Sequence, residues 1–146
     1  MFDKVLYPTD FSDVSRKALE YIKKLKNAGT RKVIVLHVID EREIEGLSQH
    51  AGRHFNVEEV EKERLEYTKK EMKAIESNLK KTGFDVKVRI ERGIPFTEIL
   101  RVEEEERASL TVLGSHGKSL VKEMLLGSVS EKVIRKSSKP VLLIRR

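Results

Sequence analysis

The sequence has 146 residues, of which 38% are hydrophobic and 37% charged, with 30 basic residues, 24 acidic residues and a formal net charge of +6. This length fits a single core, so we expect one domain over residues 1–146 and no separate substrate domain. The chain has no Cys, no apolar signal segment and no apolar run near the roughly 20 residues that a membrane span requires, so we expect a cytoplasmic protein that does not enter membranes.

Five short runs rich in Val, Ile and Leu are typical of strands that are buried on both faces. A helix is predicted between the first two runs, because apolar residues recur at helical spacing after Ser12 and Gly29 stands where a glycine stop is expected. The predicted strands are Lys4 to Tyr7, Lys32 to Val38, Val86 to Ile90, Leu110 to Leu113 and Val141 to Ile144.

The later helices are predicted by the same spacing. A long charged helix covers Val57 to Lys81 and ends before Gly83. Pro95 suits the first turn of a helix that continues to Glu106, because proline has no N–H to leave unbonded there. The last helix begins near Ser128 and precedes the final strand.

Strands and helices therefore alternate along the chain. This alternation predicts an α/β fold with an open parallel sheet, right-handed crossovers and helices on both faces. In such sheets ligands bind beyond the carboxyl ends of the strands, at the point where the strand order reverses. The loops that follow the strands are the expected location of the functional residues.

A spaced glycine pattern follows the fourth predicted strand. Gly114 and Gly117 are separated by two residues, and Gly127 and Ser128 come after nine further residues. Glycine permits a close approach of the backbone to a ligand. The helix after Gly127 offers free N–H groups and the positive end of its dipole to an anion. The pattern predicts a backbone cradle for a phosphate group.

Two better-known phosphate-binding motifs do not fit the sequence. Gly117-Lys118-Ser119 ends like a Walker A loop, but Val112 stands inside a strand where that motif requires its first glycine. No Gly-x-Gly-x-x-Gly follows the first strand, where a dinucleotide-binding domain carries it. We therefore expect neither a P-loop NTPase nor a dinucleotide-binding enzyme.

Some polar residues have a structural interpretation beside a functional one. Asp10 either accepts ribose hydroxyls or helps to hold a phosphate-bound metal, or it is a turn or capping residue near the start of the first helix. Ser128 and Glu131 have the spacing of a capping box, which by itself accounts for both residues.

The histidines outside the glycine pattern do not predict a metal site. His37 lies inside an apolar strand and is expected to be a hydrogen-bonded core histidine. His50 and His54 have helical i, i+4 spacing, but Gly52 lies between them and no third ligand is evident.

Blocks along the whole chain resemble the universal stress protein family. The glycine pattern is similar to the Gly-x-x-Gly, nine residues, Gly-Ser/Thr spacing of its ATP-binding members, and only about residues 40 to 60 find no counterpart. The other similar blocks are Val5 to Ser12, Leu36 to Val38, Gly93 to Pro95 with Ile99-Leu100, Leu126 to Val133 and Pro140 to Ile144.

The resemblance implies a sheet in the strand order 3-2-1-4-5 and a homodimer that pairs the strand Val141 to Ile144 across a two-fold axis. A short apolar edge strand would otherwise be left exposed, which also favours the dimer. The implied ligand is an adenine nucleotide, ATP, ADP or AMP, bound with Mg²⁺ or Mn²⁺.

The resemblance also implies a role for individual residues. Pro8, Thr9 and Asp10 would flank the adenosine, with Val38 at the adenine and Gly93 at the ribose. The residues implied around the phosphates are Gly114, His116, Gly117, Gly127, Ser128, Val129 and Ser130.

No catalytic group is expected at the glycine pattern. The sequence places no Ser-His-Asp arrangement, paired acids or reactive thiol there, and the nearby candidate bases are His116 and Asp10. A backbone cradle with a metal ion can hold ATP without positioning an attacking water. We therefore expect a nucleotide-dependent stress-response switch with at most slow ATP hydrolysis.

Two alternatives remain open from the sequence. The first is an interaction module of the same fold that binds no nucleotide and recruits a protein partner. The second is an enzyme that transfers adenylyl groups or hydrolyses ATP productively, for which a chain of this size has little room. Interspersed charges and scarce aromatic residues argue against nucleic-acid binding.

Overall fold

The structure is a computed structural model that describes residues 1–50, 56–115 and 126–146, with side chains in the first range described to residue 46. Its elements alternate along the chain, and each predicted strand and helix is present. In chain order they are β1 (Lys4–Pro8), α1 (Asp13–Leu25), the 3-10 helix η1 (Lys26–Ala28), β2 (Lys32–Asp40), α2 (Glu41–His50), α3 (Val57–Thr82), β3 (Asp85–Gly93), α4 (Pro95–Glu105), β4 (Leu110–Gly114), α5 (Ser128–Lys136) and β5 (Val141–Ile144).

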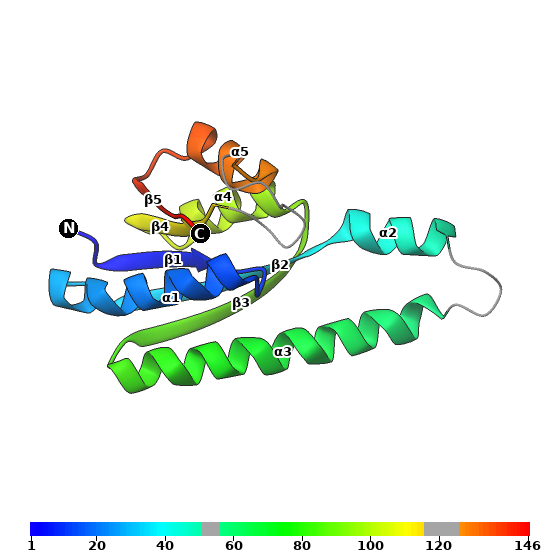
Figure 1. Cartoon of the computed structure of the whole chain (residues 1–146), viewed down its shortest axis with the longest axis horizontal. Helices are drawn as coiled ribbons and strands as arrows, with labels where there is room; N and C mark the ends of the chain where they lie inside the picture. Colours follow the sequence, from blue (N-terminus) through cyan, green and yellow to red (C-terminus); the bar gives the residue numbers. More distant parts are fainter. Residues whose placement is uncertain (51–55, 116–125) are drawn as a thin grey trace.

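The strands form one parallel sheet in the order β3-β2-β1-β4-β5, which confirms the predicted fold class and strand order. Helices α1 and α3 cover one face of the sheet, and α4 and α5 cover the other (Figure 1). The inner strands β1, β2 and β4 are mostly buried apolar segments because both of their faces are covered, whereas the edge strands β3 and β5 are largely half-buried or exposed.

Alternate residues of the central strands point to the two faces. Val5 and Tyr7 of β1 belong to the core under α1 and α3, whereas Leu6 belongs to the core under α4 and α5. This alternation is the period of two that a strand imposes on its side chains. The sheet is therefore the shared wall of two apolar cores.

The helix ends follow the sequence signals. Gly29 and Gly83 have φ values of 99° and 104°, a left-handed conformation that favours glycine, and they end the 3-10 turn and α3. Pro95 occupies the first turn of α4 as predicted. Helix α1 begins after Ser12, whose side chain accepts a hydrogen bond from the backbone N–H of Ser15.

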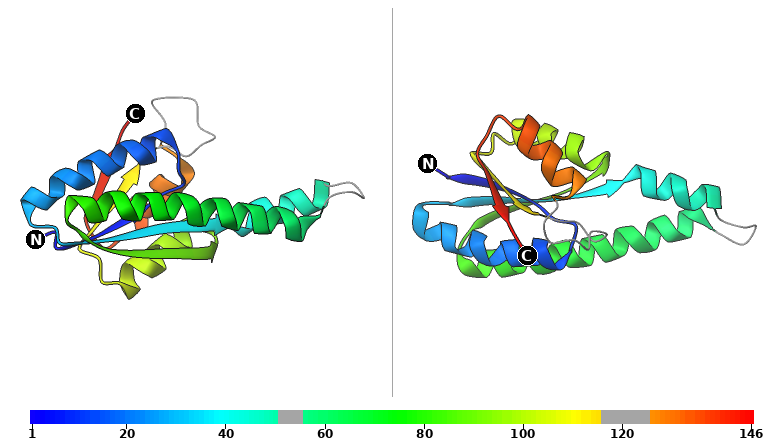
Figure 2. Two further views of the ribbon diagram at one scale, coloured as in Figure 1. Left: turned by 90° about the horizontal axis from the view of Figure 1, so that it is seen from below. Right: turned by 45° about the horizontal axis from the view of Figure 1, so that its top comes forward.

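One helix was not predicted. Helix α2 (Glu41–His50) lies in the stretch for which the sequence offered no interpretation, because Gly46 interrupts it and its apolar residues are few. Helix α2 and the first part of α3 extend past the carboxyl ends of the strands, as both views in Figure 2 show. In the part of the chain that the structure describes, no helix combines the length and apolar character needed to cross a bilayer.

Candidate functional site

The carboxyl ends of the strands meet at one edge of the sheet, where β1 and β4 diverge. Their ladder pairs only Val5 with Leu110 and Leu6 with Thr111, while β1 pairs with β2 along its whole length. The strand order reverses between these two strands, since the chain runs outward to β3 on one side and to β5 on the other. This switch point is where ligands bind in open parallel sheets.

The loop after β1 is held by a dense set of hydrogen bonds around Thr9. The Thr9 N–H donates to the Leu36 carbonyl at 2.8 Å, and Thr9 Oγ1 accepts from the Phe11 N–H at 3.1 Å and from Ser15 Oγ at 2.7 Å. Thr9 itself is buried. Its neighbour Asp10 is half-buried and accepts the Ser12 N–H at 3.0 Å through Oδ1, so Asp10 is a turn residue in this structure.

A buried tyrosine supports this loop from below. The Tyr7 hydroxyl, on a side chain with no exposed surface, donates to the Ser15 carbonyl at 2.6 Å. Burial raises the pKa of Tyr7 above its ordinary value, so the hydroxyl stays a donor. Because Ser15 also donates to Thr9, residues of β1, its loop and α1 form one connected network.

Two aromatic side chains that the sequence did not single out lie at this edge. Phe11 is buried with a left-handed φ of 65°, a conformation that is rare for a bulky residue. Its ring stacks on His37 with centroids 4.5 Å apart and meets Tyr67 of α3 edge-on at 6.0 Å. No sequence pattern signals a positive φ at a phenylalanine.

His37 is hydrogen-bonded as predicted, but its place differs from the prediction. It is half-buried at the edge of the sheet instead of in the core, and its Nδ1 donates to the Thr9 carbonyl at 2.7 Å. The ring therefore links β2 to the loop after β1. The reason is that β1 ends at Pro8, opposite Leu36, so His37 lies just beyond the end of the neighbouring strand.

Val38 and Gly93 lie on the neighbouring strands β2 and β3 near the same edge. Val38 is half-buried and opposite Glu91, and Gly93 is opposite Asp40. A Cβ on Gly93 would lie 2.8 Å from Glu98 Oε1, at a φ of 153°. The guanidinium of Arg42 bonds both oxygens of Asp40 and lowers the pKa of that carboxyl.

The two halves of the glycine pattern meet at the end of β4. The Gly127 N–H donates to the Ser115 carbonyl at 2.8 Å, and Ser130 Oγ donates to the Gly114 carbonyl at 2.7 Å. The Ser115 N–H in turn donates to the Ile144 carbonyl of β5 at 2.8 Å. These bonds hold the start of α5 against β4 and β5.

One buried polar atom at this junction has no hydrogen-bond partner among the described residues. Ser115 is only 3% exposed, and its Oγ makes no hydrogen bond within the described residues. Buried hydroxyls are nearly always hydrogen-bonded in native proteins, so an orphaned one next to a glycine pattern points to a missing acceptor or donor. His116 and Gly117, the next residues of the pattern, lie outside the described residues.

A capping box of Ser128 and Glu131 requires Ser128 as the N-cap of α5, but the helix begins one residue earlier. Gly127 is the N-cap with an extended backbone, and Ser128 is the first helical residue, so the predicted capping box of Ser128 and Glu131 is wrong. Glu131 instead pairs with Arg135 at 2.9 Å. The N–H groups of Ser128, Val129 and Ser130 form the first turn, where a helix offers its N–H groups no internal acceptor.

Gly114 has a structural role of its own. A Cβ there would lie 2.9 Å from Val14 Cγ1 and 3.1 Å from the Ser15 backbone nitrogen. The first turn of α1 therefore packs directly on the backbone of β4. Within the described residues, no group of His, Cys, Asp and Glu side chains could hold a metal ion by itself.

Comparisons with known proteins match this chain over its whole length. It fits the model of the universal stress protein family over residues 1–145. It is 46% identical to the universal stress protein MJ0577 of Methanocaldococcus jannaschii, covering 100% of this chain and 96% of that protein. The solved structure of MJ0577 superposes with a TM-score of 0.89 at 44% identity, covering 100% of this chain and 97% of the other.

More distant solved structures share the fold. A universal stress protein in complex with cAMP is 23% identical with a TM-score of 0.66, covering 99% of this chain and 97% of the other. A universal stress protein from Archaeoglobus fulgidus in complex with dAMP is 21% identical with a TM-score of 0.65, covering 99% of this chain and 98% of the other. From the family match and the close relative together, the chain belongs to the universal stress protein family.

Proposed function

We propose that this protein binds an adenine nucleotide, with ATP as the leading candidate, in the crevice between the carboxyl ends of β1 and β4. The observation that carries the proposal is the junction at Ser115, where an orphaned buried hydroxyl lies beside the first turn of α5. A phosphate group accepts hydrogen bonds from such a hydroxyl and from free helix N–H groups. Two members of the family have been solved with cAMP and dAMP, which supports an adenine nucleotide here.

The described residues fit the implied ligand. Thr9 and Asp10, with Pro8, would flank the adenosine, and the extended backbone of Val38 and Gly93 would border the base and the ribose. Asp10 keeps Oδ2 for a ribose hydroxyl or for a metal ion that the phosphates bring with them, because its described bond uses Oδ1.

The phosphates would lie at α5. Gly114, with His116 and Gly117, would line them, and the N–H groups of Ser128, Val129 and Ser130 would complete the cradle. The N–H of Gly127 already donates to Ser115, and the hydroxyl proton of Ser130 already bonds Gly114, so these two groups shape the cradle. Mg²⁺ or Mn²⁺ would neutralise the phosphate charge.

The same geometry limits the chemistry. In the described residues, the acids near this edge other than Asp10 are already paired, Asp40 with Arg42 and Glu98 with Arg101, and the sequence has no thiol. We therefore propose a nucleotide-dependent switch in the stress response with at most slow hydrolysis of ATP. Its bound form would differ from the free form in how firmly the loop after β1 and the start of α5 are joined.

We further propose a homodimer that pairs β5 strands. Strand β5 is at the edge of the sheet, and its residues Val141 to Leu143 are only half-buried. The carbonyls of Pro140 and Ile144 accept hydrogen bonds from β4, so the backbone groups of Val141 and Leu143 face the open edge. Leu143→Pro removes one such N–H and should abolish the dimer in sedimentation equilibrium, while Leu143→Ala controls for lost packing.

Calorimetric titration of nucleotide-stripped protein with ATP and Mg²⁺ tests the nucleotide proposal, using Ser128→Asp and Ser128→Asn as a matched pair. The helix dipole stabilises an aspartate in the first turn, so α5 should stay folded in Ser128→Asp. The negative charge of that aspartate should repel a bound phosphate. We expect binding by the wild type and by Ser128→Asn, and a loss of at least about tenfold in affinity for Ser128→Asp. No binding by the wild type at millimolar ATP, ADP and AMP would refute the proposal.

One observation favours the alternative of an interaction module without a nucleotide. The glycine at position 114 is required by the contact with Val14 and Ser15, whether or not a ligand is present. A failed titration with an intact fold would support that alternative. Fast phosphate release over many turnovers in the same samples would instead indicate a productive hydrolase.

A further inference from the structure

The molecule has an acidic projection at one end. We define the acidic arm as α2 together with the first part of α3, residues 41–50 and 56–66; the sequence from 41 to 66 holds eight acidic and four basic residues. The arm extends beyond the carboxyl edge of the sheet (Figures 1 and 2). It follows that most of its surface faces away from the protein's own core.

The outer carboxylates of the arm have no ion-pair partner among the described residues. Glu59, Glu63 and Glu66 recur at i, i+4 and i+7 on one face of α3, and all three are exposed without an ion pair to any described residue. The two described arginines of the arm are already engaged, because Arg42 pairs with Asp40 and Arg64 with Glu43. Lys62 is exposed three residues after Glu59 and four before Glu66, so it offsets part of this charge, and the outer face of the arm stays net negative.

The opposite charge is concentrated in the last part of the chain. Residues 1–115 hold 22 basic and 22 acidic residues, whereas residues 116–146 hold eight basic and two acidic ones, so the whole net charge of +6 comes from this segment. We define the basic face as the exposed basic side chains of α5: Lys132, Arg135 and Lys136.

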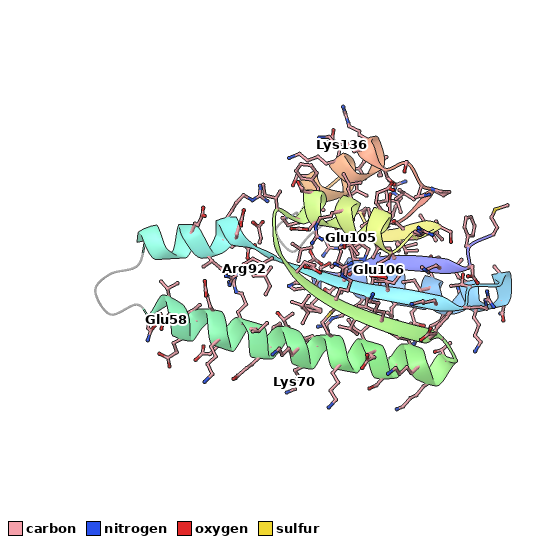
Figure 3. All side chains as sticks on the ribbon, turned by 180° about the vertical axis from the view of Figure 1, so that it is seen from behind. Glu58, Lys70, Arg92, Glu105, Glu106 and Lys136 are labelled. Carbon is pink, nitrogen blue, oxygen red and sulfur yellow. The ribbon has the colours of Figure 1, made fainter. Side chains whose placement is uncertain are left out.

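The basic face also presents apolar surface. Lys132 and Lys136 lie over the ring of Phe96, at 4.7 and 5.1 Å from its centroid, and Ile134 is 40% exposed between them in the sequence. The face lies on α5, across the sheet from α3, as Lys136 and Glu58 show in Figure 3. The arm and the basic face of one chain thus lie in different layers of the molecule.

From this complementarity we propose that the acidic arm of one copy of the chain binds the basic face of a second copy. Each chain carries both surfaces, so two copies related by a two-fold axis would make the contact twice, and copies without that symmetry would form a chain. Helix dipoles account for acidic residues in the first turn of α3 and basic ones in the last turn of α5. They do not account for Glu63 and Glu66, which lie in the second and third turns, beyond the range of that effect.

The contact differs physically from the pairing of β5 strands. Exposed charges attract only within the Debye length, about 14 Å at 0.05 M salt and about 4 Å at 0.5 M. Backbone pairing with apolar cover depends little on salt. Association that disappears at high salt therefore reports the arm and the basic face, and association that remains reports β5. The proposal does not depend on nucleotide binding.

Sedimentation velocity of the full chain, stripped of nucleotide, at low and high salt tests the proposal. We expect the apparent dissociation constant for the salt-sensitive step to rise at least about tenfold between 0.05 and 0.5 M sodium chloride. Glu59→Lys/Glu63→Lys/Glu66→Lys changes the sequence from 41 to 66 from eight acidic and four basic residues to five acidic and seven basic ones. This variant and Lys132→Glu/Lys136→Glu should each abolish the salt-sensitive step. An equimolar mixture of the two variants should restore it, because every arm then meets a face of opposite charge.

Lys69→Glu/Lys73→Glu, on the exposed outer face of α3 beyond the arm, serves as the matched control and should associate like the wild type. The proposal is wrong if the association state is the same at both salt concentrations, or if the mixture of reversed variants fails to associate. A basic face that binds duplex DNA while the protein shows no salt-sensitive self-association would also overturn it, and would assign the face to nucleic acid.

Discussion

The hydroxyl of Ser130 donates a 2.7 Å hydrogen bond to the carbonyl of Gly114, sixteen residues earlier in the chain. This bond joins the two halves of the glycine pattern, because Gly114 ends β4 and Ser130 lies in the first turn of α5. The start of α5 is therefore set in place before any ligand arrives.

Ser130→Ala removes this bond, so the Gly114 carbonyl loses its side-chain hydrogen-bond donor. We expect a loss of about 1 kcal/mol in the free energy of unfolding, measured by chemical denaturation, and a severalfold weaker affinity for ATP. Ser128→Ala, at an exposed hydroxyl two residues earlier in the same turn, should leave the stability nearly unchanged. Equal stability of both variants would contradict the structural role of Ser130.

Gly114→Ala places a Cβ 2.9 Å from Val14 Cγ1 and 3.1 Å from the Ser15 nitrogen. Because the Ser15 nitrogen is backbone and cannot move freely, we expect a destabilisation of about 1–3 kcal/mol in thermal or chemical unfolding. Gly46→Ala is the matched control, since a Cβ there meets nothing within 4 Å. That helical position should gain about 0.5–1 kcal/mol from the lower backbone entropy of alanine.

Tyr7→Phe removes the 2.6 Å hydrogen bond to the Ser15 carbonyl without removing the ring. The expected cost is about 1 kcal/mol in global stability. The more specific expectation is faster hydrogen exchange at the Phe11 amide, whose acceptor Thr9 belongs to the same network. Tyr21→Phe, at a side chain that is 40% exposed, should change neither quantity. Unchanged exchange at Phe11 would show that the loop does not depend on Tyr7.

Glu103→Ala removes a fully buried carboxylate that accepts Thr111 Oγ1 at 2.6 Å and Ser137 Oγ at 2.7 Å. Both hydroxyls lose their acceptor, so we expect about 2–4 kcal/mol of destabilisation in urea unfolding. Glu104→Ala changes the adjacent, exposed residue and should stay within about 0.5 kcal/mol of the wild type. A similar cost for the two variants would mean that the buried bonds contribute nothing.

Glu106 should make stability depend on acid pH. Its hydrogen bond with Lys87 and the nearby Arg89 lower the pKa of this carboxyl, which is 10% exposed. A lowered folded pKa contributes stability that is complete above the unfolded value of about 4.3 and is lost as the pH falls through the folded pKa. Glu106→Gln should therefore flatten the fall in stability between about pH 5 and pH 3. The same dependence of the free energy of unfolding on pH in the wild type and in Glu106→Gln would contradict this prediction. Glu66→Gln serves as the control.

The elements with a clear period were predictable from the sequence. The β1 and β2 runs are continuous apolar segments, and α3 ends at Gly83 as its glycine signal indicates. Helix α2 was missed because Gly46 interrupts a segment with few apolar residues. Its position is set by contacts with α3 and β3 and not by a local pattern.

The candidate site was predictable as a place but not in its details. The order of the strands brings the expected loops to one edge, as the alternation of strands and helices indicates. Gly127 instead of Ser128 caps α5 because the Gly127 N–H is bonded to Ser115, a partner that sequence spacing does not reveal. Glu103 lies on the buried face of α4, four residues after Ile99, but its partners Thr111 and Ser137 come from elsewhere in the chain and are not indicated by the sequence.

The short ladder between β1 and β4 has a mechanical consequence. Beyond Leu6 and Thr111, the ladder within the described residues does not join β1 to β4, so it does not connect the part of the sheet built from β3, β2 and β1 to the part built from β4 and β5. A ligand that contacts both the loop after β1 and the start of α5 would link β1 to β4 where their backbone pairing has ended. Such a ligand would add a connection between the carboxyl ends of β1 and β4 to the one that α1 already makes by packing on β4.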